Sequence, residues 1–310
     1  MPVGSVIVVS YNSEAYIEAC LLALQRVENW KVILVDNCST DKTVERAQQV
    51  GSKTCMLLNP RNLGFAAAVN QGAQVAEGDI FVILNPDTIS NSYALEKLVQ
   101  PLVAYDVGAA GGLLVPSGEP AENGFTVRRF PTLASMLVQV FLLNHIWPKN
   151  PWNRHYRCLD LNYRLAQEVD QPAGACLAVK RKAWEDVGGF DEGFFPVWFE
   201  DVDFCRRLRS SGWKIVYCPD AVFTHAGGHS VNSLRFEEKQ AFWYRNLLRY
   251  FAKHHTRVEV SLLQASVVLG LLFRVLLSLC GFQPAGVSAR EALTAYWHVA
   301  YRCASGRENL

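Results

Sequence analysis

The chain lacks the patterns of several common classes of protein. Its 310 residues include nine cysteines, but none of them forms a CxxC pair. This argues against a zinc ribbon or a disulfide framework and favours a reducing compartment. The formal net charge is +1, so the chain as a whole has no electrostatic attraction to nucleic acid. No basic segment followed by an apolar one opens the chain, so we expect no signal peptide.

Two phosphate-binding patterns are also missing. Residues 10–15, which follow the first apolar run, read Ser-Tyr-Asn-Ser-Glu-Ala and not GxGxxG. A dinucleotide-dependent oxidoreductase needs that glycine-rich turn after its first strand, so this class is excluded. The P-loop pattern GxxxxGK[ST] does not occur either.

Strand-like and helix-like segments alternate through the first hundred residues. Four nearly continuous apolar runs are rich in Val and Ile, as strands buried on both faces should be. The runs are Val6–Val9, Val32–Val35, Ile80–Leu84 and Cys176–Val179, and the helical patterns are Glu14–Arg26, Asp41–Val50 and Gly64–Ala76. This order predicts an α/β fold with a mostly parallel, Rossmann-like sheet and flanking helices.

Polar residues follow three of the predicted strands. They are Ser10-Tyr11-Asn12, Asp36-Asn37 and Asn85-Pro86-Asp87. Asn, Asp and Ser also make ordinary turns and helix caps, which is the simpler explanation for any one position. Because such sheets bind ligands at the carboxyl ends of their strands, the set of three favours a binding site.

An acid cluster comes later in the chain. Glu200, Asp201 and Asp203 open a predicted helix and follow the aromatic segment Phe194–Phe199. Acidic residues at a helix N-terminus are stabilised by the helix dipole, so capping is one explanation. Aromatic rings beside carboxylates also suit the apolar face of a sugar and raise a carboxylate pKa by desolvation. A general base for a sugar hydroxyl is therefore the other explanation.

Two residues could bind a divalent cation. Asp87 follows a buried strand, and His225 follows the predicted strand Ile215–Tyr217 beside two glycines. Carboxylate oxygens suit hard cations, and imidazole is a common metal ligand. The alternatives are that Asp87 caps a helix near Ser90–Val99 and that His225 is structural.

These residues resemble the family 2 glycosyltransferases, and within them the bacterial rhamnosyltransferase-like enzymes of cell-surface polysaccharide assembly. The resemblance covers residues 3–232. Its motifs are Val9-Ser10-Tyr11-Asn12-Ser13, Val35-Asp36-Asn37-Cys38-Ser39-Thr40-Asp41, Arg61-Asn62-Leu63-Gly64-Phe65-Ala66-Ala67-Ala68-Val69-Asn70, Leu84-Asn85-Pro86-Asp87, Gly174-Ala175, Gly188-Gly189-Phe190-Asp191-Glu192, Phe199-Glu200-Asp201-Val202-Asp203 and His225.

The resemblance implies a GT-A fold, inversion at the anomeric carbon and a role for each matching residue. Asp201 would be the catalytic base, with Glu200 and Asp203 binding the acceptor or orienting the site. Asp87 and His225 would hold Mg²⁺ or Mn²⁺. The residues assigned to the nucleotide-sugar are Ser10, Tyr11, Asn12, Asp36, Asn37, Asn62, Asn85 and Gly174.

One position departs from the family signature, which has two aspartates around a middle residue. Here the first is Asn85. The metal then has one carboxylate fewer, so the sequence predicts a weaker metal site that the donor diphosphate completes.

The resemblance also implies substrates. dTDP-rhamnose is our preferred donor, and a UDP-sugar such as UDP-galactofuranose or UDP-N-acetylglucosamine is the alternative. The acceptor would be a glycan or a lipid-linked saccharide at the cytoplasmic face of the inner membrane. A catalytically silent nucleotide- or glycan-binding subunit is the competing class, and the presence of the acid cluster and His225 disfavours it.

The C-terminal part carries the membrane signals. We expect a glycosyltransferase domain at 1–232 and a helical, membrane-associated segment at 233–310. Ser261–Phe282 is long enough to span a bilayer, but the cost of Arg274 in its centre would be about 2.5–3.5 kcal/mol. Because Arg235–Arg257 is basic and aromatic, we prefer an interfacial helix pair to a packed hairpin, and a true span comes third. The apolar run Phe130–Trp147 is either a membrane-facing excursion or a core helix with a loop.

Overall fold

The structure of the protein is a computed structural model, and it describes residues 4–51, 53–116, 125–227 and 234–305. Its internal contacts divide the chain into two units, one of residues 1–130 and 157–230 and one of residues 131–156 and 231–310. The expected domain boundary at 232 lies close to the second division. Residues 131–156, which we assigned to the first domain, group instead with the C-terminal helices.

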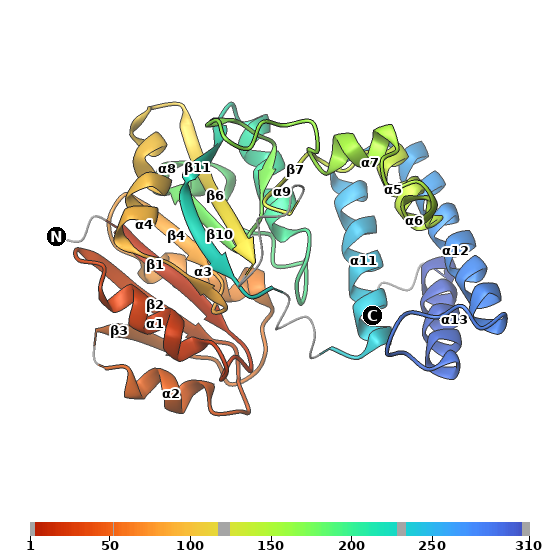
Figure 1. Cartoon of the computed structure of the whole chain (residues 1–310), viewed down its shortest axis with the longest axis horizontal. Coiled ribbons are helices and arrows are strands. Elements are labelled where there is room, and N and C mark those ends of the chain that lie inside the picture. The colour runs from red at the N-terminus through yellow and green to blue at the C-terminus, as the bar shows by residue number, and fades with distance from the viewer. Residues whose placement is uncertain (1–3, 52, 117–124, 228–233, 306–310) are drawn as a thin grey trace. The chain divides into compact units, whose positions relative to one another are not determined.

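The first unit is built on a mixed nine-stranded sheet (Figure 1). The order along its main path is β3-β2-β1-β4-β10-β6-β11-β5, and β8 pairs with β11. The strands are β1 (Gly4–Ser10), β2 (Trp30–Asp36), β3 (Thr54–Leu58), β4 (Ile80–Leu84), β5 (Thr88–Ile89), β6 (Val107–Pro116), β8 (Gln167–Glu168), β10 (Cys176–Lys180) and β11 (Lys214–His225). A separate two-stranded sheet pairs β7 (Val127–Arg128) with β9 (Gln171–Pro172).

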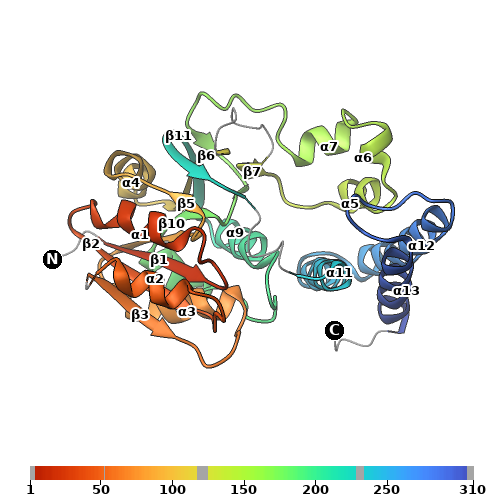
Figure 2. The same ribbon diagram turned by 60° about the horizontal axis from the view of Figure 1, so that its bottom comes forward.

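Helices cover both faces of this sheet (Figures 1 and 2). One face packs on α1 (Ile17–Gln25), α2 (Thr43–Gln49), α4 (Ser92–Val99) and η1 (Gln100–Val103). The other packs on α3 (Phe65–Val75), α8 (Arg181–Val187) and α9 (Glu200–Ser210). Successive strand residues point to opposite faces, so Val6 and Val8 enter one core while Ile7 and Val9 enter the other. This double burial is why the strands read as continuous apolar runs.

The predicted fold class is confirmed. The four apolar runs lie within β1, β2, β4 and β10, and the three helical patterns contain α1, α2 and α3. β10 differs from a simple parallel arrangement because it runs antiparallel to both β4 and β6.

One edge of the sheet gathers the polar residues. β1, β2, β4, β6 and β11 all run in the same direction and end at this edge. β10 runs the other way and starts there, with Cys176 opposite Leu84. The loop before β10 therefore lies beside the loop after β4, where Asn85 N–H donates to the Ala175 carbonyl (3.0 Å).

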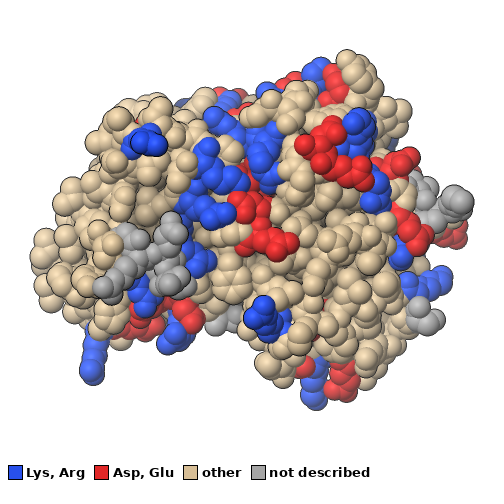
Figure 3. All heavy atoms as spheres, turned by 180° about the vertical axis from the view of Figure 1, so that it is seen from behind, with Lys and Arg blue, Asp and Glu red and all other residues tan. Residues whose placement is uncertain are grey.

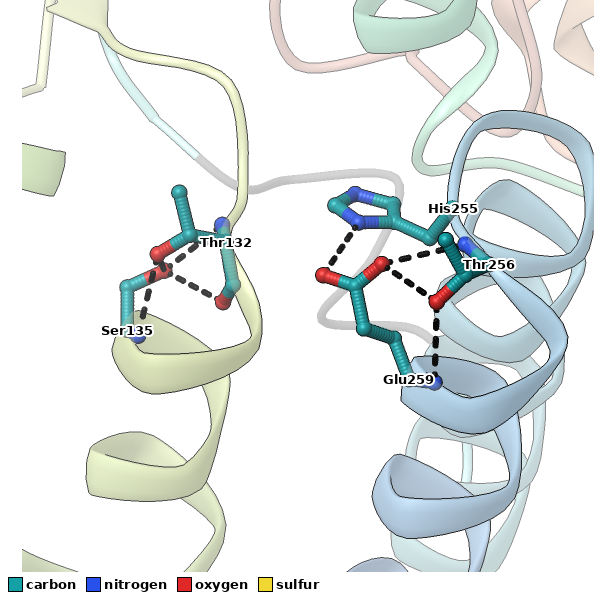
Figure 4. Close-up of polar contacts among 5 residues, drawn as sticks. All are labelled: Thr132, Ser135, His255, Thr256 and Glu259. Carbon is teal, nitrogen blue, oxygen red and sulfur yellow. Dashed lines mark hydrogen bonds and ion pairs between the residues drawn. The ribbon is translucent and has the colours of Figure 1, made fainter.

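The second unit is helical. It contains α5 (Leu133–Val140), α6 (Leu143–Ile146), α7 (Pro151–Tyr156), α11 (Phe236–His254), α12 (Arg257–Leu279) and α13 (Ala289–Ser305). Phe130–Trp147 is therefore a pair of short helices, and α5 packs on α12. Capping boxes start both of these helices, Thr132 with Ser135 at α5 and Thr256 with Glu259 at α12 (Figure 4). They satisfy backbone N–H groups that a helix start leaves without partners.

Within the described residues, α12 alone is long and apolar enough to cross a membrane. The core helix of a soluble protein passes the same test, so length and composition by themselves do not decide between the two.

Gly72 lets α3 approach the sheet closely. A Cβ atom there would lie 2.5 Å from the Ile7 Cγ2 atom. Alanine is favoured over glycine in a helix by about 1 kcal/mol, but overpacking a core costs about 1–3 kcal/mol. We expect Gly72→Ala to lower the urea midpoint of unfolding, because the stiff, buried Ile7 leaves no room. Gln74→Ala, on the exposed side of α3, should leave the midpoint unchanged; equal midpoints for both variants would contradict the close packing.

Candidate functional site

Asp87 and His225 are brought together by the pairing of β5 with β11. β5 follows β4 after a short turn and pairs antiparallel with the end of β11, with Thr88 opposite His225. Ala226 N–H donates to the Asp87 carbonyl (3.0 Å), which extends the pairing by one bond. The predicted strand Ile215–Tyr217 is thus part of a longer strand, and His225 is its last residue and does not lie beyond it.

The two side chains face each other in a buried position. His225 Nε2 lies 3.3 Å from Asp87 Oδ1, and both side chains are almost fully buried. The Nε2 atom has no hydrogen bond of good geometry among the described residues. The Phe125 ring stacks on the imidazole, with centroids 5.6 Å apart. The pair is thus held in place while its imidazole nitrogen is left available as a ligand.

The simpler explanation for Asp87 does not hold. The N-cap of α4 is Asn91, whose Oδ1 accepts from Ala94 N–H (2.8 Å). Asp87 lies before this helix, and its oxygen faces His225 instead.

The chemistry of this pair fits a divalent cation. A carboxylate oxygen and an imidazole nitrogen 3.3 Å apart are close enough to occupy neighbouring positions around one ion. The unpartnered Nε2 atom is a buried polar atom that a cation would satisfy. No third His, Cys, Asp or Glu joins them in the described part of the chain, so further ligands would come from a bound diphosphate and water. Asn85 adds no carboxylate, as the sequence predicts.

Asp201 lies at the start of α9 and is held by several donors. Its Oδ2 atom accepts from Gly174 N–H (3.0 Å) and from Gln171 Nε2 (3.4 Å), and its Oδ1 atom from Val202 N–H (2.8 Å). Burial raises the pKa of Asp201 above its usual value, and these donors limit the rise. A carboxylate with a raised pKa that is still oriented by hydrogen bonds suits a general base.

Gly174 makes this contact possible. A Cβ atom at Gly174 would lie 2.8 Å from Asp201 Oδ2. The sequence interpretation gave Gly174 to the nucleotide-sugar, which stays a prediction, and in the structure its N–H donates to Asp201.

Glu200 is buried and has a different environment. Its Oε2 atom is inaccessible and has no hydrogen-bond partner among the described residues. Burial, and then the neighbouring charge of Asp201, raise the pKa of Glu200 well above its usual value. The pKa values of the adjacent carboxyl groups of Glu200 and Asp201 thus differ, and Glu200 is the more easily protonated.

Asp203 is engaged inside the protein. It is fully buried, and its Oδ2 atom accepts from Arg207 Nε (2.8 Å), one turn along α9. The same guanidinium donates to the carbonyls of Val187 (2.5 Å) and Gly189 (2.7 Å). This arrangement is compatible with the orienting role predicted for Asp203, and its acceptor-binding role stays a prediction.

The nucleotide-side residues meet at the ends of β1 and β2. Asp36 is buried, and its Oδ1 atom accepts from Ser10 Oγ (2.8 Å) and Ser39 Oγ (2.5 Å). Its Oδ2 atom accepts from Ser39 N–H (2.9 Å). Most of the hydrogen-bonding capacity of Asp36 is thus used to join the two loops, and part of Oδ2 remains for a ligand.

Asn12, Asn37 and Asn62 connect the surrounding loops through hydrogen bonds. Asn37 Nδ2 donates to Asn62 Oδ1 (2.9 Å), and Asn37 Oδ1 accepts from Leu63 N–H (2.9 Å). Asn12 adopts a positive φ of 50° and accepts from Thr40 N–H (2.8 Å). These contacts join the loops that follow β1, β2 and β3, while the Tyr11 side chain beside Asn12 is partly exposed.

The sequence interpretation missed two residues of the site. Gln171 and Phe125 contact the predicted base and the predicted histidine ligand, respectively. Neither lies in a motif with chemical meaning. Gln171 belongs to the two-residue strand β9, and only the pairing of β9 with β7 and its closeness to α9 identify it.

This fold and site define a GT-A type glycosyltransferase. A model of glycosyl transferase family 2 matches residues 5–188, more than half of the chain, and one of glycosyl transferase family group 2 matches residues 153–302. The chain therefore belongs to glycosyl transferase family 2. The first match contains Asp36 and Asp87, and the second contains Asp201 and His225.

Individual proteins agree with this assignment. The N-acetylglucosaminyl-diphospho-decaprenol L-rhamnosyltransferase of Mycobacterium tuberculosis is 32% identical over 241 residues, which are 73% of this chain and 76% of that protein. Rhamnosyltransferase WbbL of Escherichia coli K12 is 26% identical over 80% of this chain and 92% of its own length. Mannosyltransferase PcManGT of Pyrobaculum calidifontis, solved with GDP-Man and Mn²⁺, has a TM-score of 0.57 at 18% identity, over 98% of this chain and 87% of that one, and so shares the fold.

The raised pKa of Glu200 makes a stability prediction. The folded state holds the proton at pH values where the unfolded chain has lost it, so stability falls as pH rises from the unfolded pKa through the folded one. Glu200→Gln removes this group from the titration. We expect the variant to lose less stability than the parent over that interval in urea titrations at a series of pH values. Parallel stability curves for the two proteins would contradict a buried, protonated Glu200.

Proposed function

We propose that this protein transfers rhamnose from dTDP-rhamnose to a lipid-linked saccharide, with inversion at the anomeric carbon. The observation that carries the proposal is the convergence at one sheet edge of a metal-type pair, Asp87 with His225, and an oriented carboxylate, Asp201. The two relatives named rhamnosyltransferases support the choice of sugar. The diphospho-decaprenol in the name of one of them supports a lipid-linked acceptor.

Asp201 is the general base that acts on the acceptor. The acceptor hydroxyl forms a bond to the anomeric carbon while its proton passes to Asp201 Oδ2 or Oδ1. The bond from that carbon to the diphosphate breaks, and its electron pair leaves with the phosphate oxygen. The N–H groups of Gly174 and Val202 fix the carboxylate before the proton arrives, which lowers the reorganisation that transfer requires.

Asp87 and His225 act on the donor. These two residues would hold Mg²⁺ or Mn²⁺, and the bound ion would offset the negative charge that develops on the diphosphate. Ser10, Asp36 and the loops joined by the hydrogen bonds of Asn12, Asn37 and Asn62 would bind the nucleoside. The proposed place of action is the cytoplasmic face of the inner membrane, where a lipid-linked acceptor is presented.

The donor is tested directly by a panel of dTDP- and UDP-sugars. A ligand at about 100 times its Kd stabilises the folded state by about 2.7 kcal/mol, which a thermal shift resolves. We expect dTDP-rhamnose with Mn²⁺ to give the largest shift. A larger shift with a UDP-sugar would replace the donor while leaving the family assignment intact.

Asp201→Asn should lower the kcat of sugar transfer by about 10²-fold or more, because an amide cannot accept the hydroxyl proton. Nucleotide affinity should stay close to that of the parent, since Asp201 makes no described hydrogen bond with Ser10, Asp36 or Asn37 at the nucleotide side of the site. Release of dTDP in the presence of acceptor measures the rate. Asp106→Asn, at the opposite sheet edge beside Lys214, is the matched control and should keep full activity. Full activity of the Asp201 variant would exclude it as the base.

Asp87→Asn and His225→Ala should each weaken Mn²⁺ binding by about tenfold or more, since ligand loss costs at least as much as loss of a supporting contact. Calorimetric titration of Mn²⁺ in the presence of dTDP measures the effect. His145→Ala, which removes an exposed histidine of the helical unit, should change nothing. Unchanged Mn²⁺ affinity in both site variants, or transfer that resists chelators, would rule out the metal role.

A further inference from the structure

The polarity of α12 is inverted relative to a helix that faces water. Its exposed side carries an apolar stripe, here called the α12 stripe, whose members are 44–68% exposed. They are Val258, Leu262, Leu269, Phe273, Leu276 and Leu279. Their spacing by three, four or seven residues puts them on one side of a 23-residue helix about 34 Å long. From Leu262 onward, every exposed residue of α12 is Leu, Ala or Phe.

Arg274 and Gln264 of α12 point the other way, toward the neighbouring helices. Arg274 is buried, and its guanidinium donates to the carbonyls of Gly270 (3.2 Å) and Gln139 (3.4 Å). Gln264 Nε2 donates to the Cys303 carbonyl on α13 (2.8 Å). The helix thus places Arg274 and Gln264 against its neighbours and a row of Leu and Phe side chains outward, which in water is the costly arrangement.

This inversion identifies the surface that covers the stripe. A protein–protein interface forms about one hydrogen bond per 100–200 Å² and has a polar rim. The stripe offers no side-chain donor or acceptor from Leu262 to Leu279. Lipid acyl chains need no hydrogen-bond donor or acceptor on the surface that they cover. The neighbouring helix α13 also exposes Trp297 and Tyr301, residue types that concentrate in the headgroup layer.

The packing of α12 also decides its orientation in the membrane. Its inner side contacts α5, α11 and α13, and the last two expose charged residues such as Arg249, Lys253, Arg290 and Glu291. Figure 3 shows Lys, Arg, Asp and Glu side chains gathered in clusters between broad areas of other residues on one face of the molecule. A spanning α12 would bring the charged residues of these two helices toward the hydrocarbon layer, where a charge at the bilayer centre costs about 2.5–3.5 kcal/mol. A helix lying in the membrane plane exposes only its stripe to lipid.

We propose that the α12 stripe binds the membrane by lying parallel to it in one leaflet, and that α12 does not cross the bilayer. The proposal specifies the membrane contact of the proposed function, but it does not depend on sugar transfer. Its failure would leave the enzyme assignment intact, because the stripe contains no residue of the donor or acceptor site.

The first test measures sedimentation of the full chain with vesicles of phosphatidylethanolamine and phosphatidylglycerol. The double variant L269E/L276E should bind at least about tenfold more weakly than the parent, because two Leu side chains lose their transfer to lipid. Both positions are exposed, so the variant should keep the parent circular-dichroism spectrum and melting temperature. The matched control V103E/Y105E changes two exposed apolar residues of the first unit and should bind like the parent.

The second test measures depth. A spin-labelled unnatural amino acid is placed at Leu262, Leu269 or Leu276, and its collisions with oxygen and with a water-soluble nickel chelate are compared. Similar shallow depths at all three positions support the proposal, and a deep centre between shallow ends overturns it in favour of a span. Unchanged vesicle binding of L269E/L276E also overturns it. A third result would also overturn it: the parent does not bind vesicles but forms a dimer, and L269E/L276E abolishes that dimer. A second copy of the chain would then cover the stripe.

Discussion

The site depends on the pairing of β5 with the end of β11. That short antiparallel pair holds the segment after β4 against the last residue of a strand from much later in the chain, and so sets His225 opposite Asp87. The reversed strand β10 makes the second connection, since it starts beside the end of β4 and brings Gly174 to Asp201. Two long-range pairings thus place the residues proposed to bind the donor and the acceptor at one edge of one sheet.

The cost of burying charged groups at this edge is offset in three ways. Asp203 and Arg207 neutralise each other, and the guanidinium also bonds two carbonyls, so the pair leaves little polar capacity unused. Asp201 is satisfied mainly by backbone N–H groups, which orient it and still allow it to take a proton. Glu200 has no such partners, and the protonated form favoured by its raised pKa is the form that burial tolerates.

Much of the fold and part of the site could be predicted from the sequence. Continuous apolar runs identified β1, β2, β4 and β10 because both faces of these strands are buried, whereas the partly buried β3 and the Gly-rich β6 gave no comparable signal. Motif spacing singled out Asp87, Asp201 and His225, but not their geometry, which long-range pairing creates. Gln171 and the grouping of residues 131–156 with the C-terminal helices also follow from tertiary contacts that no local pattern encodes.

The central claim is that Asp87 and His225 hold one metal ion together with the donor diphosphate. Electron spin-echo modulation of Mn²⁺ bound to the full chain with dTDP tests this most directly, because it detects a nitrogen nucleus coordinated to the ion. The structure predicts nitrogen modulation that disappears in His225→Ala and persists in His145→Ala. A spectrum without coordinated nitrogen in the parent protein would contradict the account.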